Sequence, residues 1–128
     1  NTDQRPAKDV IVACAAATSS EGYDRPSLAL DQHRFLRELT LAKPPKPLVV
    51  LVIAPGAVLT DWAARADAVL LMFLAGQAAG EAWADVLLGD TSPSGKLPLT
   101  LPESESDVQP PCEAAECECV EGLAVGWR

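Results

Sequence analysis

The 128-residue sequence has one histidine, fewer basic than acidic residues and no long apolar run. Its net charge of −8 would repel a phosphate backbone, so we expect no nucleic-acid partner. The longest apolar run, AVLLMFLAG, is far shorter than the ~20 residues that a membrane-spanning helix needs, and we expect no membrane span. The sequence contains no G-x-S-x-G motif, and His33 would have to serve any serine or cysteine nucleophile. We therefore disfavour both hydrolase types and expect His33 to be an exposed helix residue with a structural or solvated role.

Cysteine is also scarce. Cys14 lies in an apolar run and is predicted to be a buried free thiol. Cys112, Cys117 and Cys119 crowd into CEAAECEC, where they could form a disulfide, remain thiols, or bind zinc if His33 or another ligand joined them. The C-x4-C-x-C spacing is a poor match to zinc sites, so we expect no metal. The GDTSPSGK segment has five residues between its glycines where a phosphate-binding loop has four, and we expect no cofactor.

Apolar and helical segments alternate along the chain. Strands are predicted over 9–16, 48–54 and 67–75, and helices over 31–42, 60–66 and 76–89. This order is typical of an α/β fold with a parallel sheet and right-handed crossovers. The strands lack polar alternation, which predicts burial on both faces of the sheet.

The helix predicted over 31–42 has a plausible N-cap in Asp31. Phe35, Leu36 and Leu39 follow at helical spacing and are predicted to share its buried face.

The aromatic residues divide into two groups. Trp62 and Trp83 lie on predicted helices and are expected to pack between elements. Tyr23 and Trp127 lie in turn-like segments, where an aromatic face could contact a sugar ring or a neighbouring domain.

The segment SSEGYDR follows the first predicted strand and so lies at the carboxyl edge of the sheet, where such folds usually place their sites. Two interpretations stay open for it. Asp24 and Arg25 could form a local ion pair beside a solvated Glu21, or Glu21 could be an acid with a chemical role.

Several motifs carry a family resemblance when they are taken in order. EGYDRPSLAL, LAGQAAG, ADVLLGDTSPSGKLPLTLP and EGLAVGWR together resemble the C-terminal α/β-sandwich domain of glycoside hydrolase family 3, over about residues 8–102 and 120–128. The resemblance implies a three-layer α/β sandwich with a mainly parallel sheet. It also implies that residues 1–128 form a single, incomplete domain. Residues 103–119, which are acidic and bear three cysteines, are predicted from their composition to be a surface loop within it.

The family includes β-glucosidases, and the resemblance implies a retaining hydrolysis of terminal sugars from a β-linked glucoside or related oligosaccharide. It makes Glu21 the candidate general acid/base and places the nucleophile in an N-terminal TIM-barrel domain. Tyr23, Asp24, Arg25 and Trp127 become candidates for substrate binding or loop positioning. A secreted or lumenal location is favoured by the resemblance, and the isolated chain is expected to be inactive. The alternative is a stand-alone carbohydrate-binding or scaffolding module without catalysis.

Overall fold

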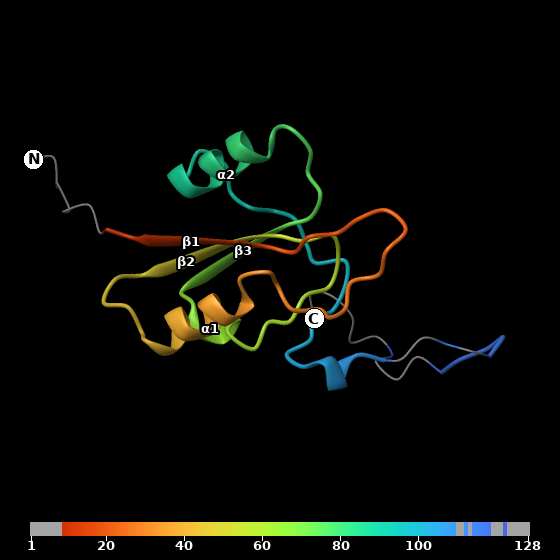
Figure 1. Ribbon diagram of the computed structural model, residues 1–128. Coiled ribbons are helices and arrows are strands. Elements are labelled where there is room, and N and C mark those ends of the chain that lie inside the picture. Colours follow the sequence, from red (N-terminus) through yellow and green to blue (C-terminus); the bar gives the residue numbers. More distant parts are fainter. Residues whose placement is uncertain (1–8, 110–111, 113, 119–121, 123–128) are drawn as a thin grey trace, which may run out of the picture.

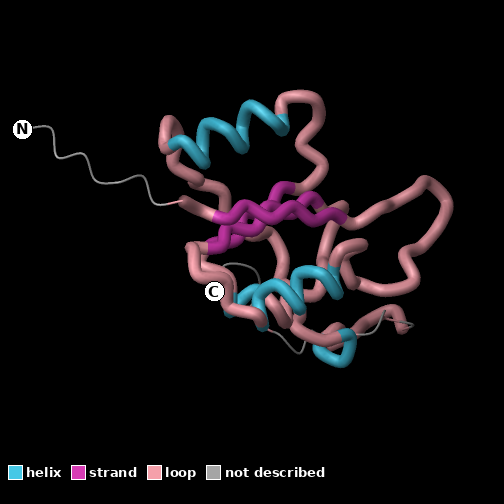
Figure 2. Tube along the Cα trace, turned by 60° about the vertical axis from the view of Figure 1, so that its left-hand side comes forward, coloured by secondary structure: helices cyan, strands magenta, loops and turns pink. Residues whose placement is uncertain are grey.

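The computed structural model describes residues 9–109, 112, 114–118 and 122. Three parallel strands form one sheet in the order β1-β2-β3, and helices α1 and α2 lie on its opposite faces (Figures 1 and 2). The predicted α/β class with its parallel sheet is confirmed. The elements are β1 Ile11–Ala16, α1 His33–Leu41, β2 Leu48–Ile53, the 3-10 turn η1 Ala63–Arg65, β3 Ala68–Met72, α2 Ala79–Leu88 and the 3-10 turn η2 Glu105–Asp107. None of the helices in the described part is long and apolar enough to cross a bilayer.

The hydrophobic core lies between α1 and the sheet. The central strand β2 supplies Val50 and Val52, α1 supplies Leu36, and Trp62 enters from the segment before η1. The Trp62 side chain is completely buried and its Nε1 donates to the carbonyl of Leu59 at 3.2 Å, so its polar group costs little to bury. These buried side chains pack α1 and the segment before η1 against one face of the sheet.

The opposite face of the sheet is only partly covered, which corrects the expectation of burial on both faces. Along β1, Ala13 and Ala15 are buried whereas Val12 and Cys14 are exposed, because successive side chains of a strand point to opposite faces. Helix α2 lies over that second face but buries none of its own residues fully. The prediction that Cys14 is buried is therefore wrong.

Helix α1 differs from its prediction at three positions. Phe35 is 51% exposed while Leu36 is fully buried, because the helix turns the two neighbours in different directions. Asp31 is not the N-cap: Gln32 takes that position without a side-chain cap bond. His33 is half-buried and its Nε2 lies 3.0 Å from an Asp61 carboxylate oxygen, so it is structural but not exposed.

Candidate functional site

The loop that follows β1 is closed at its base by Asp31. The Asp31 N–H donates to the carbonyl of Ala16 at 2.8 Å, and the Asp31 carboxylate accepts from the Thr18 hydroxyl at 2.5 Å and from the Thr18 N–H at 3.1 Å. Both bonds stabilise the charged carboxylate and lower the pKa of Asp31 below its ordinary value of 3.8; the Thr18 hydroxyl has the larger effect and the Thr18 N–H the smaller one. Residues 18–30 thus form a loop whose two ends are held together beside the end of β1.

At the far end of this loop, Glu21 and Gly22 form a tight turn. Ser20 and Tyr23 pair as an antiparallel bridge, which leaves the two residues between them at the apex. Gly22 has φ +76, in the left-handed region that favours glycine. Glu21 is exposed, and no hydrogen bond or ion pair joins it to another residue in the described part of the chain. Its carboxyl group is thus presented to the outside of the loop.

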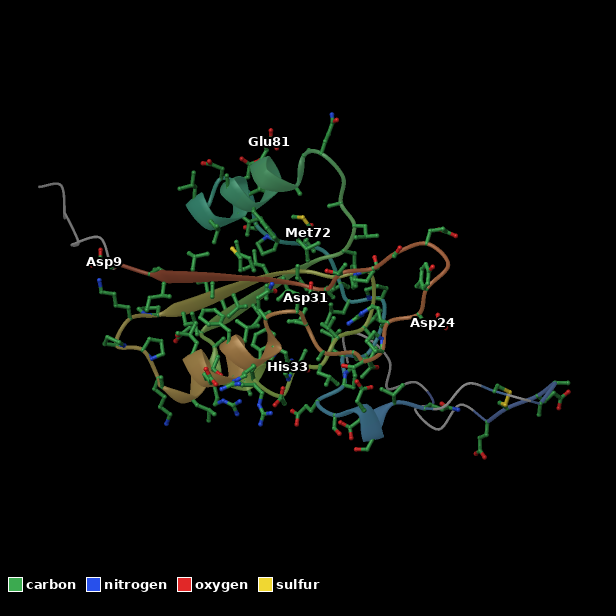
Figure 3. The ribbon with its side chains drawn as sticks, in the orientation of Figure 1. Asp9, Asp24, Asp31, His33, Met72 and Glu81 are labelled. Atoms are coloured by element: carbon green, nitrogen blue, oxygen red, sulfur yellow. A yellow bond between two sulfur atoms is a disulfide. The ribbon has the colours of Figure 1, made fainter. Side chains whose placement is uncertain are left out.

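Arg25 secures the middle of the loop in a way that sequence reasoning missed. Its guanidinium donates to the carbonyl of Ala57 at 3.1 Å and to that of Ala29 at 3.2 Å. The ion pair with Asp24, which one of the two open interpretations allowed, is not formed among the described residues. Asp24 lies on the outer part of the loop with its carboxylate exposed (Figure 3). Arg25 is therefore a loop-positioning residue by its contacts.

A hollow of about 300 Å³ lies inside the loop, lined by residues 18–20, 23–27, 29 and 31. Its lining residues include an aromatic residue, serines, a cation and two acidic residues: Tyr23, Ser19, Ser20, Ser27, Arg25, Asp24 and Asp31. Tyr23 is 81% exposed, which leaves its ring face free for contact. Polar and charged residues around one aromatic ring suit a polyhydroxylated ligand.

Trp127 and Cys119 fall outside the described residues. Cys112 and Cys117 form a disulfide, which is one of the alternatives left open by their spacing.

Sequence reasoning also missed Glu105, whose carboxylate accepts from the Leu28 N–H in the candidate loop at 2.7 Å. A contact between residues 77 positions apart leaves no local signal in the sequence.

Comparison with known proteins gives a consistent result. The family model described as "Glycosyl hydrolase family 3 C-terminal domain" matches residues 1–123. An exo-alpha-(1->6)-L-arabinopyranosidase of Bifidobacterium breve is 38% identical over 88% of this chain and 16% of its own length, and thermostable beta-glucosidase B of Acetivibrio thermocellus is 35% identical over 85% and 15%. The crystal structure of a beta-D-glucoside glucohydrolase from Trichoderma reesei superposes with a TM-score of 0.70 at 29% identity, covering 94% of this chain and 19% of that one. The chain therefore spans about one-sixth of the length of the curated relatives it matches.

Proposed function

The chain belongs to the glycosyl hydrolase family 3 C-terminal domain family, and on that premise we propose that its residues form one domain of a larger β-glucosidase-like enzyme. In this proposal Glu21 is the general acid/base, and a TIM-barrel domain of the same enzyme supplies the nucleophile. The substrate is a β-linked glucoside or a related oligosaccharide. The observation that carries the proposal is the position of Glu21: its carboxyl group, which has no partner among the described residues, stands at the exposed apex of a turn whose supporting loop is fixed at its base.

The chemistry explains why an exposed acid suits a domain of this kind. A retaining glycosidase needs two carboxyl groups about 5–5.5 Å apart, one to attack the anomeric carbon and one to protonate the leaving oxygen. A carboxyl group at the tip of a loop can reach a nucleophile on a facing domain, whereas one packed against its own sheet cannot. Enclosure between two domains would also remove water from the acid and favour its protonated form.

Tyr23, Asp24 and Arg25 then have distinct proposed roles. Tyr23 and Asp24 line the hollow beside the turn and would contact hydroxyls or a ring face of the sugar. Arg25 would hold the loop through the carbonyls of Ala57 and Ala29. The relatives act on different sugars by name, an arabinopyranoside in one case and a glucoside in another, and we propose the β-glucoside as the first substrate to test.

The test is Glu21→Gln in the longer enzyme that contains this chain, with Glu81→Gln as the matched control. Glu81 is an exposed glutamate in the first turn of α2, on the other side of the sheet from α1 (Figure 3). Loss of a general acid should lower kcat/KM by about 10²–10⁴-fold for a poor leaving group and much less for a dinitrophenyl leaving group, which departs without a proton. An unchanged kcat/KM for cellobiose would refute the assignment.

A second readout uses Glu21→Ala with sodium azide. Without the base, the glycosyl-enzyme intermediate reacts slowly with water, whereas azide attacks without needing a proton removed. Azide should therefore restore turnover of the dinitrophenyl glucoside and yield the β-configured glycosyl azide. An α-configured product would contradict the retaining mechanism.

The hollow, with its serine residues and the exposed Tyr23 ring, also favours a second candidate, a carbohydrate-binding module that performs no catalysis. It predicts that the 128-residue chain itself binds glucose or cellobiose in a calorimetric titration. Binding should be lost in Tyr23→Ala and kept in Glu21→Gln. On the leading proposal, the isolated chain instead shows no turnover of an aryl β-glucoside, because its nucleophile is absent.

A further inference from the structure

The segment 102–107 lies against the loop that carries Glu21, although the two are far apart in the sequence. The carbonyl of Pro102 accepts from the Thr60 N–H at 2.9 Å and from the Thr60 hydroxyl at 3.0 Å. These two bonds attach the segment to the part of the chain that leads into the buried Trp62. The segment is therefore anchored to the core at its first residue.

A capping box gives this segment a defined shape. The Ser104 N–H donates to the Asp107 carboxylate at 2.8 Å, and the Ser104 hydroxyl accepts from the Ser106 N–H at 3.2 Å. Reciprocal bonds of this kind satisfy the free N–H groups of a helical turn and hold it in one conformation. The turn η2 thus presents the Glu105 side chain in a fixed direction.

Glu105 completes a clamp on the backbone of Leu28. Its carboxylate accepts from the Leu28 N–H at 2.7 Å, while the Leu28 carbonyl accepts from the Leu59 N–H at 2.9 Å. Leu28 lies on the arm of the loop that returns from the turn at Glu21, three residues beyond Arg25. Both polar groups of this residue are therefore held, one by each neighbouring segment.

We propose that Glu105 is a positioning residue for the general acid/base. Its carboxylate fixes the returning arm of the loop, so that the turn at Glu21 meets the scissile bond in one orientation. This inference rests on the proposed role of Glu21. It concerns a residue outside the loop that the family motifs mark.

The experiment compares three variants in the longer enzyme: Glu105→Ala, Glu105→Gln and the control Glu103→Ala. Glu103 is exposed two residues away and makes no hydrogen bond or ion pair with the described residues. Glu105→Ala should lower kcat/KM for cellobiose roughly tenfold, the kinetic equivalent of one hydrogen bond to a charged group. The dinitrophenyl glucoside, which needs no acid, should change less than about twofold.

Rescue by the conservative variant separates positioning from general damage. Glutamine keeps an oxygen that can accept from Leu28, so Glu105→Gln should recover most of the lost kcat/KM, and Glu103→Ala should match the parent enzyme. Amide hydrogen exchange provides a readout that does not depend on catalysis. Exchange of the Leu28 amide, whose N–H donates to Glu105, should accelerate in Glu105→Ala and match the parent enzyme in Glu103→Ala.

The outcomes distinguish the two claims. If Glu21→Gln shows the leaving-group dependence and Glu105→Ala does not, the acid assignment stands and the positioning role is overturned. If amide exchange at Leu28 accelerates in Glu105→Ala, but neither Glu21→Gln nor Glu105→Ala alters kcat/KM, the clamp exists and the proposed role of Glu21 fails. Equal losses on both substrates would mean that Glu105 supports the fold and not the acid.

Discussion

Truncation of Leu36 tests the packing of α1 against the sheet. Leu36 is 0% exposed and is the apolar side chain that α1 buries completely, whereas its neighbour Phe35 is 51% exposed. Leu36→Ala removes three buried carbon atoms, worth ~0.8 kcal/mol each. The cavity left behind raises the expected loss in unfolding free energy to about 3 kcal/mol. Phe35→Ala, although it removes more atoms, should cost about 1 kcal/mol because half of that side chain already lies in water.

The assay is urea unfolding of the 128-residue chain, followed through tryptophan fluorescence. Trp62 is fully buried beside this layer, so its emission reports exposure of the core. Alanine and leucine have similar helix propensities, so the loss in Leu36→Ala reflects packing. A loss below about 1 kcal/mol for Leu36→Ala, or a larger loss for Phe35→Ala, would refute the orientation of α1 described above.

Three further predictions concern single positions. Gly22→Ala should destabilise the chain by about 1 kcal/mol in the same urea assay, because Gly22 has a left-handed φ that strains any residue with a Cβ, even though no atom lies within 4 Å of the position that the Cβ would take. Gly56→Ala is the control. Its Cβ would also have no atom within 4 Å and its φ is not left-handed, so this substitution should not destabilise the chain. The Asp31 carboxyl has a lowered pKa, so it stabilises the fold above pH 3.8 and loses that contribution as the pH falls through its lowered value. Acid unfolding of Asp31→Asn should therefore lack this component, and an unchanged acid profile would contradict the role of Asp31 at the loop base. Cys14 is free and exposed, so brief treatment of the native chain with iodoacetamide should alkylate it, as peptide mass mapping would detect; protection until denaturation would mean that it is covered.

The sequence predicted the three strands well because each is a short apolar run between turn-forming residues. It could not show which face of β1 is covered, since Ala13, Cys14 and Ala15 are all small and apolar. Coverage depends on where α1 and α2 pack, and that is a tertiary property. The error over the exposure of Cys14 has this origin.

The candidate site divides in the same way. The turn that carries Glu21 and Gly22 follows from the local sequence, because a turn requires specific residues at adjacent positions, whereas the chemical role of Glu21 stays a prediction. The contacts that support the turn could not, because they join distant segments: Arg25 reaches Ala57, and Glu105 reaches Leu28. Asp31 looked like a helix cap because the same residue types cap helices and close loops.

The three-stranded sheet has a consequence for handling the chain in solution. In the described part of the chain, β1 and β3 each pair on one side only, which leaves a row of backbone N–H and C=O groups on each edge that can bond to another molecule. At neutral pH the net charge of −8 keeps molecules apart, but this repulsion vanishes near the isoelectric point of about 4.5. We therefore expect colloidal stability to reach a minimum near that pH, with scattering that grows with concentration while the individual fold is still intact.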